Sequence, residues 1–127
     1  MSIDPVQEWL ALASQDEQSA RFLMDMQPLP LEVICFHCQQ AAEKLLKALI
    51  AKNMLPIPRT HDLLQLLDII RTVHPAFIDL EPAMYDLNDF SVIVRYPAHI
   101  PLEASDTMNA LKAVETIKLK ILKIMPY

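Results

Sequence analysis

The sequence predicts an all-α fold, a bundle of four to five helices that forms one domain over residues 1–127. The chain has 127 residues and no glycine, which disfavours the hairpin turns and positive-φ corners of β-rich folds. Its 10 prolines divide it into segments. Within these segments apolar residues recur every three or four positions, which is the period of a helix with one buried face.

The two N-terminal helices are marked by proline and by a capping residue. The first predicted helix covers residues 5–25, with Asp4 as its N-cap and Pro5 at its first position, where proline is well tolerated. The second covers residues 31–54 and follows two further prolines, which end the first helix. It is the longest predicted element.

Three more helical segments follow. The third helix begins after Thr60, which we expect to be its N-cap, and ends before Pro75. A fourth stretch over residues 77–94 is broken or restarted at Pro82, because proline removes a helical amide hydrogen. The last helix covers residues 103–124; its acidic beginning and lysine-rich end complement the helix dipole.

Composition excludes several classes of protein. Without glycine there is no glycine-rich phosphate loop, so nucleotide sites of the Rossmann and Walker types are excluded. The net charge is −5, so any nucleic acid contact must be local rather than a general polyanion surface. The sequence has neither a secretory leader pattern nor a long apolar run, and we therefore expect a soluble, cytoplasmic protein with no membrane contact.

Cysteine and histidine occur together in the second predicted helix as Cys35, His37 and Cys38. A closed zinc site needs four ligands, and this helix supplies three at most, two of which diverge by about 100°. We therefore expect buried, reduced thiols and neither a metal nor a cofactor.

A polar ridge lies on the second predicted helix. It contains His37, Gln40, Lys44 and Lys47, which share a face because they are separated by three, four and three positions. One interpretation is a solvated face in which Glu43 and Lys47 form a pair. The other is a cleft whose amide, imidazole and ammonium groups bind a phosphate or a base.

Two further polar residues favour a partner in the same region. Asp16 interrupts the apolar stripe of the first helix, and a buried carboxylate needs a cationic or hydrogen-bonding partner. We expect a structural pair with Lys44 or Arg95, and a catalytic acid is the alternative. His61, at the predicted start of the third helix, could face the same cleft.

The third cluster contains Asn88, Arg95 and His99. Arginine suits a phosphate and histidine can transfer protons near neutral pH. Together Arg95 and His99 would suit metal-free RNA cleavage, in which a 2′-hydroxyl attacks the adjacent phosphate. The alternative is a surface turn in which Arg95 bonds helix-end carbonyls.

Three strings taken together resemble the HEPN family, named for higher eukaryotes and prokaryotes nucleotide-binding. The resemblance extends from about Trp9 to the last helix, and it implies an up-and-down α-helical bundle of a kind that commonly forms a homodimer. The strings are Cys35–Lys44, Arg59–Leu63, and Leu87–Phe90 followed by Arg95-Tyr96-Pro97.

The resemblance implies two kinds of function. Many members of the family are metal-independent endoribonucleases, often toxins, with an arginine followed after a short spacer by histidine; Arg95 and His99 are the matching pair here. Only three residues separate them, and the Arg-Tyr-Pro form resembles the branch that accompanies a small nucleotidyltransferase.

The favoured implication is a nucleotide- or RNA-binding partner of a minimal nucleotidyltransferase in a toxin–antitoxin type pair. The alternatives are the endoribonuclease and a non-catalytic helical dimerisation module. The residues expected to bind nucleotide or RNA are His37, Gln40, Lys44, Lys47, Asp16, His61, Asn88, Arg95 and Tyr96.

Overall fold

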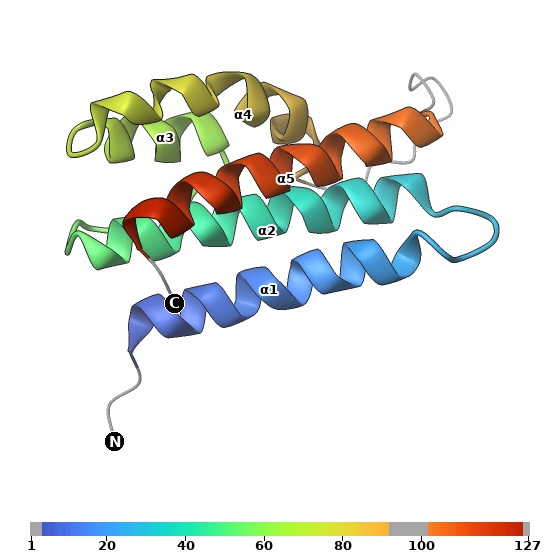
Figure 1. Ribbon diagram of the computed structural model, residues 1–127, viewed down its shortest axis with the longest axis horizontal. Helices are drawn as coiled ribbons and strands as arrows, with labels where there is room; N and C mark the ends of the chain where they lie inside the picture. Colours follow the sequence, from blue (N-terminus) through green and yellow to red (C-terminus); the bar gives the residue numbers. More distant parts are fainter. Residues whose placement is uncertain (1–3, 92–101, 126–127) are drawn as a thin grey trace.

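The computed structural model describes residues 4–91 and 102–125, in which the regular elements are all helical (Figure 1). Three long helices, α1 (Pro5–Leu23), α2 (Leu31–Lys52) and α5 (Ala104–Ile124), run alongside one another, and α2 contacts both of the others. Two shorter helices, α3 (Leu63–Arg71) and α4 (Glu81–Leu87), pack against α2 and α5 respectively. The all-α bundle predicted from the sequence is confirmed.

Helix α2 is the centre of the core. Its small residues Ala41, Ala42 and Ala48 are fully buried, which lets neighbouring helices approach closely. Ile34 and Ile50 are buried near its two ends. The central position of α2 explains why its polar residues must find partners inside the protein.

The start of α1 is as predicted and the start of α3 is not. Asp4 caps α1, because its Oδ1 accepts a hydrogen bond from the Val6 amide at 3.0 Å. The N-cap of α3 is Asp62, whose side chain accepts from the amide two residues later at 3.0 Å. Thr60, the predicted cap, instead accepts from the Asp62 amide at 3.1 Å. The predicted cap of α3 is therefore wrong: Thr60 and Asp62 are both good capping residues, and the helix begins after the second of them.

The end of α2 contains a strained residue. The helix ends at Lys52, two residues before the predicted end. Met54 then has a φ of 58°, and its amide bonds the Ala51 carbonyl while the Leu55 amide bonds that of Ile50. These two bonds form the Schellman motif, which favours glycine at the left-handed position. Met54 occupies that position at a steric cost, because this chain contains no glycine.

The predicted fourth helical stretch is divided into three short elements. The structure has the 3₁₀ helix η1 (Pro75–Leu80), then α4, then the 3₁₀ helix η2 (Asn88–Phe90). The restart expected at Pro82 is confirmed, since α4 begins at Glu81. The last three residues of the predicted stretch lie outside the described residues. Helix α5 begins after Glu103, whose amide donates to Asp106 at 2.7 Å.

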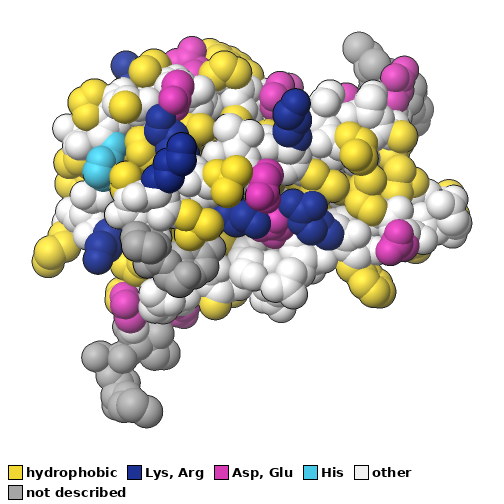
Figure 2. All heavy atoms as spheres, in the orientation of Figure 1, with side chains coloured by type: hydrophobic (Ala, Val, Ile, Leu, Met, Phe, Trp, Pro, Cys, Tyr) yellow, Lys and Arg dark blue, Asp and Glu magenta, His cyan; other side chains and the backbone are white. Residues whose placement is uncertain are grey.

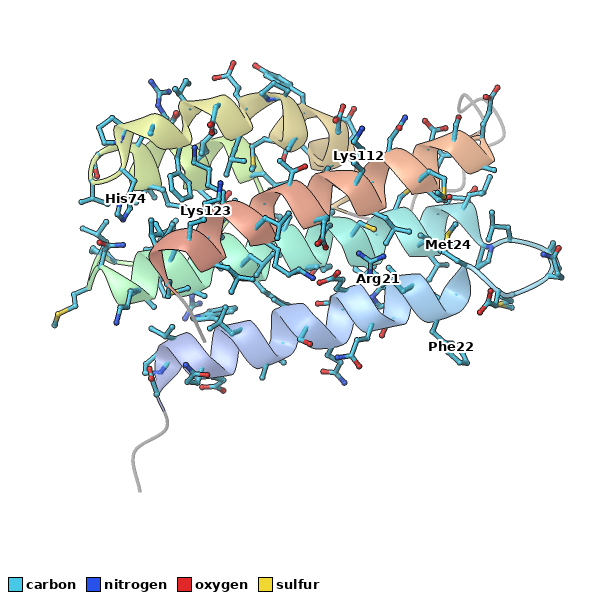
Figure 3. The ribbon with its side chains drawn as sticks, in the orientation of Figure 1. Arg21, Phe22, Met24, His74, Lys112 and Lys123 are labelled. Carbon is cyan, nitrogen blue, oxygen red and sulfur yellow. The ribbon has the colours of Figure 1, made fainter. Side chains whose placement is uncertain are left out.

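Ion pairs close the seam between α1 and α5. Arg21 bonds Glu17 at 2.9 Å and reaches Glu115 at 3.4 Å, and Lys118 bonds both glutamates at 3.1 Å. Figure 2 shows basic and acidic side chains side by side on this face of the bundle, and Figure 3 places Arg21 between the two helices. Burial alone would lower the pKa of Lys118, but its hydrogen bonds to Glu17 and Glu115 raise that pKa above its ordinary value.

Among the described residues, no helix combines the length and the apolarity that crossing a membrane requires.

Candidate functional site

Asp16 of α1 connects two residues of the polar ridge on α2. Its Oδ1 lies 2.9 Å from Nδ1 of His37, and its Oδ2 accepts a hydrogen bond from Nζ of Lys44. The Asp16 side chain is only 13% exposed, so these contacts compensate the cost of burying its charge. The predicted pair between Asp16 and Lys44 is confirmed.

Glu43 of α2 holds a second network of the same kind. Its Oε2 lies 3.1 Å from Nζ of Lys47, and its Oε1 lies 2.7 Å from Nδ1 of His61. Both Glu43 and Lys47 are buried, and Nζ of Lys47 lies 5.5 Å from the ring centroid of Trp9. The Glu43–Lys47 pair is therefore confirmed, but the interpretation that places it on a solvated face is wrong, because both residues are buried and Trp9 of α1 lies against Lys47.

The two networks share one arrangement, in which a carboxylate bridges a lysine and a histidine Nδ1. Each ring therefore keeps its Nε2 for other contacts, and neither Nε2 has a hydrogen-bond partner among residues 4–91 and 102–125. The His37 side chain is 27% exposed and that of His61 is 69% exposed. Two fixed imidazoles are thus accessible to a ligand, while each lysine is neutralised by a carboxylate.

Two glutamines of α2 extend the second network. Nε2 of Gln40 donates to Oε1 of Gln39 at 2.7 Å, and Nε2 of Gln39 donates to the His61 carbonyl at 2.9 Å. Gln39 is fully buried and Gln40 is half-buried. Sequence reasoning missed Gln39 because adjacent glutamines give no signal of which one faces inward.

Asn88 holds the start of α3. Its Oδ1 accepts from the Leu63 amide at 2.8 Å, and its Nδ2 donates to Oδ1 of Asp62 at 3.0 Å. Both ends of its amide therefore have a structural role, unlike the ligand contact expected for this residue. Through Gln39, His61 and Asn88, the described parts of the three sequence strings meet at one junction.

A shallow hollow of about 480 Å³ lies beside the first network, and we refer to it as the α1 hollow. Phe22 is 80% exposed there, and Figure 3 shows its ring pointing away from the bundle. Sequence reasoning missed this hollow, although Phe22 lies off the apolar stripe of its helix, which was the available signal. The lining residues are Gln18, Ser19, Phe22, Leu23 and His37.

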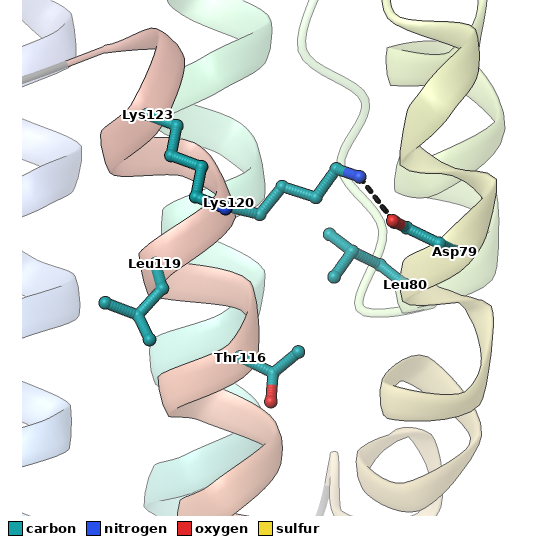
Figure 4. A pocket seen from close by; sticks show the side chains of 6 residues that line it. All are labelled: Asp79, Leu80, Thr116, Leu119, Lys120 and Lys123. Atoms are coloured by element: carbon teal, nitrogen blue, oxygen red, sulfur yellow. Dashed lines mark hydrogen bonds and ion pairs between the residues drawn. The ribbon is translucent and has the colours of Figure 1, made fainter.

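Another hollow, of about 360 Å³, lies between α5 and η1 (Figure 4). Lys120 crosses it and bonds both carboxylate oxygens of Asp79 at 2.6 Å and the Ala76 carbonyl at 3.0 Å. These contacts use the three hydrogens of the ammonium group, so Lys120 is committed to structure.

The two cysteines are buried and unpaired. Burial raises the pKa of each thiol, and for Cys35 the carboxylates of Asp106 and Glu32 act in the same direction; both pKa values reach about 12. The expectation of buried, reduced thiols is confirmed. Within residues 4–91 and 102–125, no group of three or more histidine, cysteine or acidic side chains is placed to hold a metal ion.

The predicted catalytic pair, Arg95 and His99, and the predicted binding residue Tyr96 lie outside the described residues. Their roles therefore stay predictions. Ser91, which follows η2, is the last described residue before them.

Comparisons with known proteins agree with this architecture. The HEPN domain model matches residues 6–124. The crystal structure of TT1696 from Thermus thermophilus is similar, with a TM-score of 0.74 and 23% identity over 95% of this chain and 98% of that one. The crystal structure of ST0689, an archaeal HEPN homologue, is similar with a TM-score of 0.66 and 25% identity, over 91% of this chain and 97% of that one. A comparison with curated proteins finds no match. Since the family model covers nearly the whole bundle, this chain belongs to the HEPN domain family.

Proposed function

We propose that this HEPN protein binds a nucleotide or an RNA strand on the polar surface of α2, as the partner of a minimal nucleotidyltransferase in a toxin–antitoxin type pair. The observation that carries the binding proposal is the pair of accessible imidazoles, His37 and His61, each held at Nδ1 by a buried carboxylate. Gln40 lies on the same face of α2 as His37, and Gln39 connects it to the segment that carries His61. An imidazole fixed in this way offers one defined nitrogen to a ligand.

The charge of this surface favours local contacts over a broad phosphate cradle. Lys44 and Lys47 are both paired with carboxylates, so they add little net positive potential. Histidine, glutamine and any contribution from Arg95 and Tyr96 would then provide the polar contacts. The homodimer and the nucleotidyltransferase partner rest on the family resemblance alone.

The binding proposal is tested by calorimetric titration of the purified protein with ATP, GTP and a short single-stranded RNA. We expect His37→Ala and Gln40→Ala to weaken binding at least tenfold, because both side chains offer hydrogen-bonding groups on this surface. Lys112→Ala is the matched control, because Lys112 lines a different hollow between α4 and α5. Absence of binding by the wild type, or equal binding by all variants, refutes the proposal.

The same protein, incubated with RNA in the presence of a chelator, tests the alternative function. RNA cleavage that disappears in Arg95→Ala and in His99→Ala would replace the binding role with that of a metal-independent endoribonuclease. Co-purification with a nucleotidyltransferase expressed from a neighbouring gene tests the partner; no association would remove that part of the proposal.

A further inference from the structure

We propose that the α1 hollow binds an unpaired nucleobase, which stacks on Phe22 and is recognised through its base edge rather than through its phosphates. This inference rests on the proposed function and specifies that the α1 hollow contacts the base of the ligand.

The stacking surface is Phe22. Its side chain is 80% exposed, which leaves a large apolar ring in water. Bases stack on exposed aromatic side chains in proteins that bind single strands, and the loss of one such contact weakens binding by roughly 10- to 100-fold. A planar base over Phe22 would cover the ring and occupy the hollow.

The polar groups of the hollow suit a base edge. Nε2 of Gln18 donates to the hydroxyl of Ser14 at 2.9 Å, and Oγ of Ser19 donates to the Gln15 carbonyl at 2.8 Å. These bonds orient both side chains and leave the Gln18 carbonyl and the Ser19 lone pairs as acceptors. They could accept from the exocyclic amino group or a ring N–H of a base.

His37 adds one oriented nitrogen. Its Nδ1 lies 2.9 Å from Oδ1 of Asp16, so the ring can rotate only by breaking that contact. Lys44 holds the other oxygen of Asp16, which fixes the carboxylate in turn. His37 lines the hollow, and Nε2 is the one ring nitrogen that its contact with Asp16 leaves for a ligand.

The charges around the hollow argue against phosphate as the recognised group. Of the residues that line it, none is a lysine, an arginine, an aspartate or a glutamate. The nearby Lys44 is already paired with Asp16. Binding through the hollow should therefore depend on salt far less steeply than binding that neutralises phosphates, for which each contact changes the slope of log K against log salt by about one.

The test uses a short single-stranded RNA that carries one 2-aminopurine, whose fluorescence is quenched by stacking. We expect quenching with the wild type, a 10- to 100-fold weaker affinity with Phe22→Ala, and near wild-type affinity with Phe22→Trp, which keeps a stacking surface. Met26→Ala is the control, because Met26 is a half-exposed apolar residue outside the hollow. The salt slope should be the same for wild type and Phe22→Ala.

Three results would overturn the inference. If the RNA binds and Phe22→Ala binds equally well, the hollow is not the base site, and the proposed function survives. If neither RNA nor nucleotide binds to the wild type, both proposals fail. If light scattering shows that Phe22→Ala converts a wild-type dimer to a monomer, Phe22 is a contact between two copies of the chain instead.

Discussion

The buried thiols of Cys35 and Cys38 predict a measurable loss of stability in alkaline solution. The pKa of each rises from an ordinary 9.0 to about 12 in the folded protein. Below pH 9 the thiols are protonated in both the folded and the unfolded protein, so they do not lower the free energy of unfolding. Between pH 9 and 12 the unfolded chain loses protons that the folded protein retains, so the free energy of unfolding falls. At pH 10 the expected loss is about 3 kcal/mol for the two thiols together.

The assay is urea unfolding followed by circular dichroism at pH 8 and pH 10. Lysines and tyrosines also titrate in this range, so the quantity to compare is the change in the wild type minus the change in a Cys35→Ala/Cys38→Ala double variant. We expect the double variant to be less stable at pH 8, because it loses core volume. The difference in free energy of unfolding between the wild type and the double variant should then decrease by about 3 kcal/mol at pH 10. A gap that stays constant would refute the reasoning, since the thiols would then ionise equally in both states.

Four substitutions test other features through the free energy of unfolding. Met54→Gly should stabilise the protein by up to about 1 kcal/mol, because glycine accepts the positive φ and the Met54 side chain is exposed; a loss would contradict the strain. Asn88→Ala should cost about 1 to 2 kcal/mol by removing two hydrogen bonds at the start of α3, and a neutral result would count against that role. Glu43→Gln should cost about 3 to 5 kcal/mol, because it leaves the buried Lys47 without its counter-charge, and a cost below about 1 kcal/mol would show that the pair is solvated. The ammonium group of Lys118 stabilises the fold only while it is charged, so the wild type should lose free energy of unfolding above pH 10.5 relative to Lys118→Met. The loss should stay below about 1 kcal/mol, because a quarter of the Lys118 side chain is exposed. If the free energies of unfolding of the two proteins change equally with pH, the raised pKa does not contribute to stability.

The helices were predictable because their signals are local. An aspartate before a proline marks the start of α1, and Pro82 marks the restart at α4, without reference to any distant residue. The start of α3 was not predictable in this way. Thr60 and Asp62 are both good capping residues, and the choice between them is connected to Asn88, which bonds Asp62 from 26 positions away. A local pattern does not contain that contact.

The candidate site was predictable only in part, for a related reason. Asp16 interrupts an apolar stripe, so its need for a cation could be inferred, and Lys44 is that cation. The spacing of Glu43 and Lys47 is the same in an exposed pair and a buried one. Whether Trp9 covers the pair depends on how α1 is rotated against α2, and this rotation is set by packing along the whole helix.

The two networks also explain how one helix can hold both of its neighbours in register. A buried charge is tolerated only when its partners are in place, so Asp16 fixes α1 at the height of His37 and Lys44. Glu43 in the same way fixes the segment before α3 through His61. The cost of each carboxylate is offset only in the native arrangement, which disfavours any sliding of the helices. The same contacts that align the bundle therefore set the orientation of both imidazoles, and a ligand site on α2 would be rigid because the fold requires it to be.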